Sequence, residues 1–267
     1  MLFRSLREIA ESGVATKHLP FRWGCRWDWP DRLLAPMAIR AAEQADVIVM
    51  LKWFTPKFRA RLRDAMARQG RQPKLIYMTA YRPAEWERGT WDADSINRDF
   101  EAIIVQAKCF EEDLRQMGYR NKIAVIPYLP PDPLEPQPMP PGDRLRIGFL
   151  GRLEAQKNLG YLLDSLVALT PELEKRGLPM WELHLFGDGS QRKSLEQQAA
   201  ALGHAGDVHF HGTVRGEAKE KALLSCHLFA NPSVSEGQCL VAIEVISRGR
   251  PLVATPVGAL QIGRAHV

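Results

Sequence analysis

One 28-residue segment carries the most informative pattern of the chain: Asn231-Pro-Ser-Val-Ser-Glu-Gly-Gln-Cys-Leu-Val-Ala-Ile-Glu-Val-Ile-Ser-Arg-Gly-Arg-Pro-Leu-Val-Ala-Thr-Pro-Val-Gly258. An apolar strand leads into a loop, and the loop is expected to place Glu236 at the start of a helix. Glu244 follows two turns later, about 12 Å along the helix axis and about 80° around it. Two carboxylates so arranged can accept hydrogen bonds from hydroxyl groups on two parts of one elongated ligand.

The start of this predicted helix would also suit phosphate, because free backbone N–H groups and the positive end of the helix dipole attract anions. Carboxylates for hydroxyl groups beside a phosphate-binding helix start favour a ligand made of sugar, phosphate and ribose, which describes a nucleotide sugar. The alternative for an isolated Glu-x7-Glu pair is that both side chains lie on a solvated helix face, so the surrounding sequence has to distinguish the two.

Length and composition restrict the class of protein. A chain of 267 residues is long enough for two domains, and 45% hydrophobic and 25% charged residues are typical of a soluble globular protein. No apolar run approaches the roughly 18 residues that span a bilayer, and the N-terminus lacks the core of a signal peptide. The four cysteines show no metal-binding spacing, which favours reduced thiols in a cytoplasmic protein.

Apolar strands alternate with helices along the chain, and this order predicts parallel, doubly wound α/β sheets. Eight prolines between Pro127 and Pro141 predict an extended linker, because proline fits neither a helix interior nor a central strand. The expected organisation is an N-terminal Rossmann-like domain over 1–126, the linker over 127–143, a C-terminal Rossmann-like domain over 144–261 and a tail over 262–267. Two such domains would face each other across a cleft.

Three loops are expected at the carboxyl ends of strands, where open α/β sheets bind ligands. Gly151 follows one strand and begins a loop that carries the cations Arg152 and Lys157. Gly187 begins a tight turn after the next strand, and the two-glutamate segment follows a third. Each signal is weak alone, but their order and common placement together favour a binding site.

This set of motifs resembles the retaining glycosyltransferases of the GT-B fold, family 4, also called glycosyltransferases group 1. The resemblance covers about residues 144–258 closely and 43–128 loosely. It implies transfer of a sugar from a nucleotide diphosphate to an acceptor hydroxyl with retention, without a metal or cofactor, in polysaccharide or glycolipid assembly. The leaving phosphate would deprotonate the acceptor.

The resemblance also implies a role for each motif residue. Arg152 and Lys157 would neutralise the diphosphate, Glu236 would contact the donor sugar, and Glu244 would hold the ribose hydroxyls. Arg152, Lys157 and Glu236 are therefore the expected catalytic residues. The expected donor-binding residues are Gly151, Gly187, Gly237, Gln238, Cys239 and Glu244, of which Gly237, Gln238 and Cys239 would supply amides from the helix start.

The chain departs from the family at several positions. Gln238 and Cys239 stand where Phe-Gly or Phe-Ser is common, and Tyr81 or Arg82 would have to replace a histidine that contacts the donor sugar. Both ends look incomplete: the first residues read like the helix after a missing strand and loop, and Ile262–Val267 matches the translation of a sequencing adapter. His184, His209 and His211 are expected to be core or loop residues.

The expected partners are a UDP-, GDP- or ADP-sugar and an unidentified hydroxyl acceptor. Much of the net charge of +5 lies between Lys52 and Lys74, where eight Lys and Arg residues accompany one acid. A basic amphipathic helix over 56–69 would suit a lipid-linked acceptor and peripheral contact with the inner face of a membrane. Nucleic acid is not expected, because aromatic residues do not alternate with these charges.

Two other functions remain open. A non-catalytic GT-B-like module or partner subunit would explain the changed residues at Gln238 and Tyr81, although it gives no reason to keep Arg152, Lys157, Glu236 and Glu244 together. A nucleotide-sugar epimerase shares the architecture, but it would need further acidic and histidine residues near the sugar that the sequence does not supply.

Overall fold

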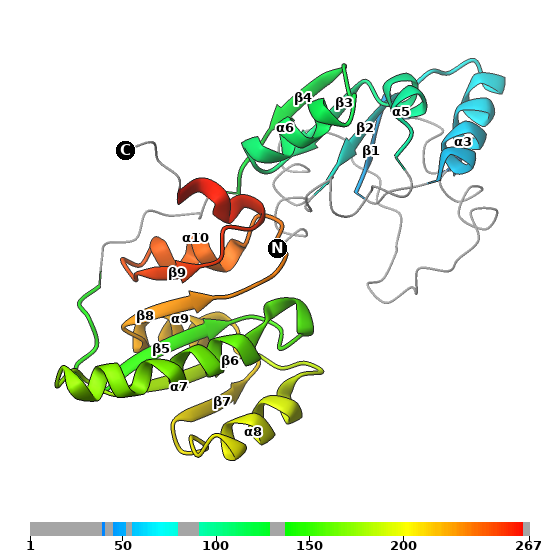
Figure 1. The fold of residues 1–267 in the computed structure, drawn as a ribbon. Helices are drawn as coiled ribbons and strands as arrows, with labels where there is room; N and C mark the ends of the chain where they lie inside the picture. The colour runs from blue at the N-terminus through cyan, green and yellow to red at the C-terminus, as the bar shows by residue number, and fades with distance from the viewer. Residues whose placement is uncertain (1–38, 41–44, 52–54, 80–90, 129–136, 264–267) are drawn as a thin grey trace. The chain divides into compact units, whose positions relative to one another are not determined.

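The computed structural model describes residues 39–40, 45–51, 55–79, 91–128 and 137–263. The chain divides into two compact units, one containing strands β1 to β4 and the other β5 to β9 (Figure 1). The predicted contact residues Tyr81 and Arg82, most of the predicted proline-rich linker, the N-terminal segment and residues 264–267 lie outside the described residues.

The first unit contains a four-stranded parallel sheet in the order β1-β2-β3-β4. Its strands are β1 (Val47–Met50), β2 (Lys74–Met78), β3 (Ala102–Val105) and β4 (Lys122–Val125). Its helices are α3 (Pro56–Arg68), α5 (Ala93–Asp99) and α6 (Lys108–Gln116). The sequence pattern predicted all of these except the short, mostly polar α5.

Helix α3 is amphipathic, as its sequence predicts. Thr55 caps its start by accepting a hydrogen bond from the Phe58 N–H, and proline occupies the first turn, where no N–H is needed. The apolar residues of one face are buried, but so is one cation of the predicted basic face. Arg59 is fully buried, with its Nε 2.7 Å from the Asp99 carboxylate, because the interior supplies a charged partner.

The second unit contains a five-stranded parallel sheet in the order β7-β6-β5-β8-β9. Its strands are β5 (Leu145–Leu150), β6 (Trp181–Phe186), β7 (Val208–Gly212), β8 (Leu228–Asn231) and β9 (Leu252–Ala254). Its helices are α7 (Leu159–Lys175), α8 (Arg192–Ala201), α9 (Gly216–Ser225) and α10 (Leu240–Ile246), with 3-10 turns at Ala155–Lys157 and Gly258–Gly263. Helix α9 was not predicted.

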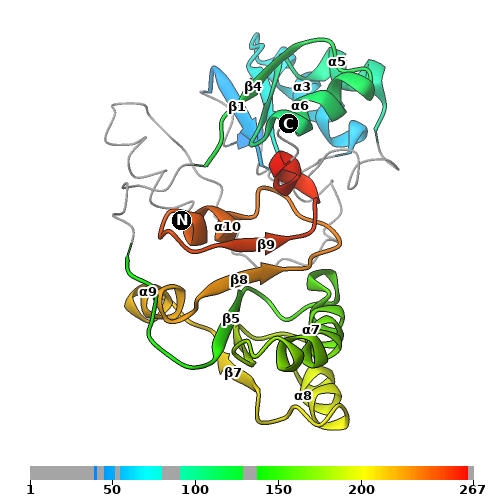
Figure 2. The ribbon, with the colours of Figure 1, turned by 60° about the vertical axis from the view of Figure 1, so that its left-hand side comes forward.

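Helices cover both faces of this sheet (Figure 2). Helices α7 and α8 pack on one face over a core that includes Leu163, Leu183 and Leu195. Helices α9 and α10 pack on the other face around Phe186 and Phe229. The expectation of parallel, doubly wound α/β units is therefore confirmed. No described helix is both long and apolar enough to cross a membrane.

The strand order creates a switch point between β5 and β8. The chain proceeds from β5 to β6 and β7 on one side, and then returns to add β8 and β9 on the other. Loops that leave neighbouring strands in opposite directions open a crevice at the carboxyl edge of the sheet. The loops after β5 and β8, which carry the predicted motifs, lie at this point.

Candidate functional site

Two glycine turns bring the loops after β5 and β6 into direct backbone contact. The Gly151 N–H donates to the Phe186 carbonyl at 3.0 Å, and the Leu153 N–H donates to the Asp188 carbonyl at 2.9 Å. A Cβ added at Gly187 would stand 1.7 Å from the Gly151 oxygen. Glycine is therefore required at Gly187 for the two loops to meet, which explains the glycine motifs on packing grounds.

Glu236 and Lys157 form an ion pair at the switch point. The Lys157 Nζ lies 2.6 Å from Glu236 Oε1, and the two side chains are 17% and 7% exposed. The same oxygen accepts hydrogen bonds from Asn231 Nδ2 at 3.0 Å and Ser233 Oγ at 2.7 Å. No donor among the described residues reaches Oε2 of Glu236, so one carboxylate oxygen is held by the protein while the other keeps its acceptor capacity.

The pKa of Glu236 lies below its ordinary value. Burial of the carboxyl group acts to raise this pKa, but hydrogen bonds from Lys157, Asn231 and Ser233 and the positive charge of Lys157 outweigh the effect. Glu236 is therefore an anion at neutral pH in spite of its burial.

The loop that carries Glu236 is held from both sides. On one side, the Val234 N–H donates to the Gln156 carbonyl at 3.0 Å, and the Gln156 side chain donates to the Ser235 carbonyl at 2.7 Å. On the other, a Cβ at Gly258 would stand 2.1 Å from the Glu236 oxygen. The loops after β5 and β9 thus fix the backbone on which Glu236 stands.

The expected position of Glu236 on the helix is wrong. Helix α10 begins at Leu240, so Glu236, Gly237 and Gln238 lie in the preceding loop, and Cys239 is the N-cap with a left-handed φ of 51°. The tertiary contacts of the loop hold it in a non-helical path. The expected axial spacing of the two glutamates does not apply, and of the three predicted amide donors only Cys239 stands at the helix start.

Glu244 lies on α10 and pairs with a cation that the sequence pattern did not single out. Its Oε1 lies 2.7 Å from Lys219 Nζ on α9, and the two side chains are 12% and 29% exposed. A second pair, Arg248 with Glu220, joins the same two helices. The missed signal was the run of alternating charges over 217–221, which gives no partner until the helices pack.

The remaining predicted residues have different surroundings. Arg152 follows Gly151 and is exposed. Gln238 is buried, and its carboxamide Oε1 has no hydrogen-bond partner among the described residues, while its Nε2 lies 3.4 Å from the Tyr128 carbonyl. Burial raises the pKa of the Cys239 thiol to about 11, as does the negative charge of Glu236, so this thiol is protonated at neutral pH.

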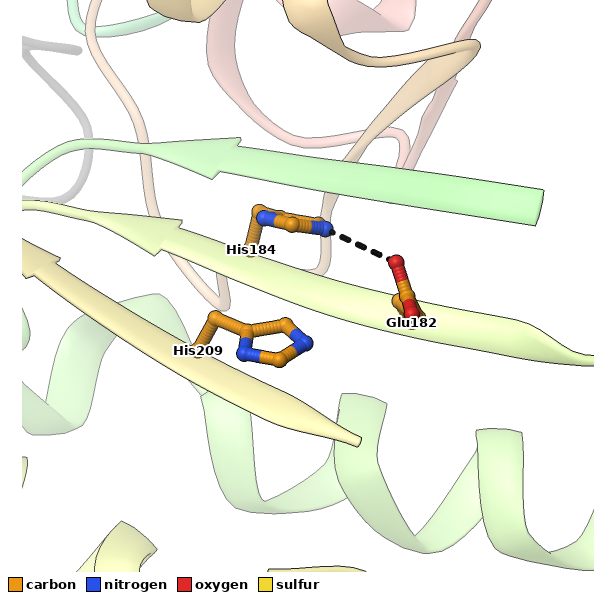
Figure 3. Close-up of side chains that lie close together, drawn as sticks. All are labelled: Glu182, His184 and His209. Carbon is orange, nitrogen blue, oxygen red and sulfur yellow. Dashed lines mark hydrogen bonds and ion pairs between the residues drawn. The ribbon is translucent and has the colours of Figure 1, made fainter. Parts of the chain in front are cut away.

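A group of possible metal ligands lies elsewhere in the second unit, on strands β6 and β7 (Figure 3). Glu182, His184 and His209 offer ligand atoms that all lie within 4.8 Å of one another. The sequence pattern indicated no metal-ligand cluster, and these histidines were expected to be core or loop residues. The signal that could have revealed the group was the pair of alternating motifs Glu182-x-His184 and His209-x-His211, since neighbouring parallel strands bring such motifs onto one face.

With this geometry established, residues 144–266 match the family described as glycosyl transferases group 1. This part of the chain belongs to that family. The match includes Arg152, Lys157, Glu236 and Glu244 and leaves the first unit outside it.

Curated relatives match this glycosyl transferases group 1 region. An uncharacterized glycosyltransferase of Methanocaldococcus jannaschii is 34% identical over 118 residues, 44% of this chain and 29% of the relative. A D-inositol 3-phosphate glycosyltransferase of Stackebrandtia nassauensis is 33% identical over 124 residues, 45% and 28%. One component of the human phosphatidylinositol N-acetylglucosaminyltransferase is 27% identical over 139 residues, 52% and 28%. The matched part is less than a third of each relative.

Solved structures resemble more of the chain. HepE of Anabaena in complex with UDP and glucose superimposes with a TM-score of 0.66 at 21% identity, covering 97% of this chain and 72% of HepE. The lipopolysaccharide outer core galactosyltransferase WaaB gives 0.65 at 17% identity, covering 85% and 62%. Both likenesses confirm the GT-B type of fold, with two Rossmann-like units.

Proposed function

We propose that the chain is part of a retaining glycosyltransferase that transfers a sugar from a nucleotide diphosphate to an acceptor hydroxyl. The observation that carries the proposal is the buried Lys157–Glu236 pair at the switch point, within a region that belongs to glycosyl transferases group 1. A charged pair held on three loops at the carboxyl edge of a parallel sheet is typical of a ligand site rather than of a solvated surface.

Glu236 would contact the donor sugar. Its Oε1 is held by Lys157, Asn231 and Ser233, and its Oε2 would accept a hydrogen bond from a sugar hydroxyl. The buried Gln238 side chain, two residues on, has an acceptor oxygen without a partner among the described residues, and we assign it to the same sugar.

Lys157 and Arg152 would stabilise the leaving diphosphate. In the transfer, the bond between the anomeric carbon and the phosphate oxygen breaks, and a bond to the acceptor oxygen forms on the same face of the sugar. The acceptor proton passes to the leaving phosphate. Cations that are already in place when the phosphate charge develops lower the barrier, so the step needs neither a metal nor a protein base.

Glu244 would hold the ribose hydroxyls, as the resemblance implies, and this role gives a direct test. Glu244→Gln keeps the shape of the side chain but removes the charge that accepts the hydrogen bonds. The affinity for one of UDP, GDP and ADP should fall by about 10- to 150-fold, measured by isothermal titration calorimetry.

The matched control is Glu217→Gln, which removes a carboxylate from an exposed Lys–Glu pair on α9 and should leave nucleotide affinity unchanged. Equal affinity in wild type and Glu244→Gln would remove the ribose role. If none of the three nucleotides binds the folded chain, the function changes to a non-catalytic GT-B-like module.

The acceptor is proposed to be a lipid-linked hydroxyl at an anionic membrane. Helix α3 presents Lys57, Arg61 and Arg68 to solvent, although buried Arg59 no longer counts toward this surface. The human relative is named for phosphatidylinositol, which agrees with a lipid acceptor.

Removal of the three exposed α3 cations should weaken binding to vesicles rich in phosphatidylserine by about 100-fold at low salt. The variant is Lys57→Gln, Arg61→Gln and Arg68→Gln together, and sedimentation with vesicles measures the binding. The control substitutes Lys175, Lys193 and Lys221 of the second unit by Gln, which makes the same change of net charge. Equal loss in both variants would mean that α3 has no special part in the contact.

A further inference from the structure

Four titratable side chains lie together on one face of the β6–β7 edge of the second sheet. Glu182 and His184 alternate along β6, and His209 and His211 alternate along β7, with His184 directly opposite His209 in the register. The residues between them point to the other face, where Leu183 and Val208 belong to the core under α7 and α8. The histidine face is therefore fixed by the same strand alternation that builds the core.

Three of these side chains converge (Figure 3). The imidazole Nε2 of His184 lies 3.4 Å from Glu182 Oε2, and the rings of His184 and His209 stand 4.7 Å apart. The ligand atoms of Glu182, His184 and His209 all lie within 4.8 Å of one another, and the three residues are partly buried. Two imidazoles and one carboxylate at this range form a ligand set that divalent zinc accepts.

We propose that Glu182, His184 and His209 bind a divalent transition metal ion of the zinc class, which joins β6 to the edge strand β7. Zinc–nitrogen and zinc–oxygen distances of about 2.1 Å place tetrahedral ligand atoms about 3.4 Å apart. The three ligand atoms must close from as much as 4.8 Å, a change that rotation of the side chains supplies. A water molecule would complete the coordination.

The surrounding groups hold the ligands in suitable orientations. His184 Nδ1 lies 3.0 Å from His211 Nε2, so His184 can donate a hydrogen bond to His211 while its Nε2 faces the metal. The other carboxylate oxygen of Glu182 lies 3.3 Å from Arg144 Nε. Metal-binding histidines and carboxylates commonly have such partners, which fix the ring tautomer and the carboxylate direction.

The histidines are also in the protonation state that metal binding needs. Burial lowers the pKa of His184 to about 4, and the neighbouring His209 and His211 add to the effect while Glu182 opposes it. Burial and His209 lower the pKa of His211 as well. Both rings are neutral at neutral pH, so no proton has to leave them before they bind a cation.

The chain, freed of metal by dialysis against a chelator, should bind one Zn²⁺ in competition with a chromophoric chelator. His184→Ala and His209→Ala should each weaken this binding by at least about 100-fold, and Glu182→Gln should weaken it by about tenfold or more. Zn²⁺ should raise the melting temperature of the wild type but not of His209→Ala, because a ligand that binds only the folded state stabilises it.

His211→Ala tests the supporting role. It should weaken Zn²⁺ binding by about 10- to 100-fold, yet the visible spectrum of bound Co²⁺ should keep the band positions of the wild type. A changed Co²⁺ spectrum would make His211 a direct ligand instead of a positioning residue.

The matched controls are His204→Ala and His227→Ala, which remove histidines of the same unit that lie outside the cluster. His204 pairs with Asp207, and His227 accepts a hydrogen bond from the Arg146 N–H, so neither is expected to affect Zn²⁺ binding. The proposal is overturned if the folded wild-type chain binds no Zn²⁺. It is equally overturned if folded His184→Ala and His209→Ala bind Zn²⁺ as tightly as the wild type.

Discussion

Lys157→Met should destabilise the second unit by about 3 kcal/mol at neutral pH. The substitution leaves the carboxylate of Glu236, which is 7% exposed, without its cation. Asn231 and Ser233 would still donate hydrogen bonds to it, but they carry no charge to offset the burial. Urea unfolding, with hydrogen exchange at the amides of β5 and β8 to isolate this unit, measures the loss.

The loss should depend on pH. In the wild type the pKa of Glu236 is lower in the folded than in the unfolded chain, so its contribution to stability is complete above the unfolded pKa. That contribution disappears as the pH falls through the folded pKa. In Lys157→Met burial prevails and raises the pKa of Glu236, so protonation relieves the variant first. The difference in stability should therefore be largest near pH 7 and should shrink toward pH 3.

Two further variants identify the cause of the loss. Lys157→Met combined with Glu236→Gln removes both charges and should recover most of the stability lost in the single variant, because no buried ion is left unpaired. Lys193→Met, at an exposed position of α8, should change stability by less than about 0.5 kcal/mol. A double variant as unstable as Lys157→Met would show that packing of the lysine stem, not charge, accounts for the loss.

Gly187→Ala should destabilise the second unit by about 3–5 kcal/mol, which makes it the other large effect. The added Cβ would meet the Gly151 carbonyl oxygen at 1.7 Å, and the φ of 154° at this position is unfavourable for alanine. The obstacle is backbone, which no side-chain rotation can move aside. The loops after β5 and β6 must therefore separate, and urea unfolding measures the cost.

The same substitution should weaken nucleotide binding more than its effect on stability alone predicts. The loop displaced from Gly187 carries both Arg152 and Lys157, so their positions relative to Glu236 would change. Titration with the nucleotide that the wild type binds, at a temperature where the variant is folded, measures this effect. Wild-type affinity in folded Gly187→Ala would show that contact between the two loops does not position the cations.

Gly203→Ala is the matched control for Gly187→Ala. Gly203 also has a positive φ, of 77°, but a Cβ added there would meet nothing within 4 Å. Alanine at Gly203 should cost only about 1–2 kcal/mol for its left-handed backbone and should not alter nucleotide binding. Equal losses at Gly187 and Gly203 would attribute the effect of Gly187→Ala to backbone conformation, without a contribution from contact with Gly151.

The sequence alone determined the architecture of each unit. Apolar runs with period two and helical faces such as Phe58, Leu62 and Met66 predicted every described strand and most helices to within a few residues. The glycine turns and the two-glutamate segment predicted which strand ends carry the loops of the site. These features are local: they follow from side-chain period, turn chemistry and the backbone freedom of glycine, which a linear sequence displays.

Tertiary structure alone decided which charges meet. Lys157 and Glu236 are 79 positions apart, yet the loops after β5 and β8 bring them to 2.6 Å, and Lys219 reaches Glu244 only through the packing of α9 on α10. Arg59 looks like a member of a basic surface until Asp99 receives it in the interior. The metal-ligand group likewise exists only in the β6–β7 register. A charged side chain is compatible with solvent or with any partner of opposite charge, and only the path of the backbone selects among them.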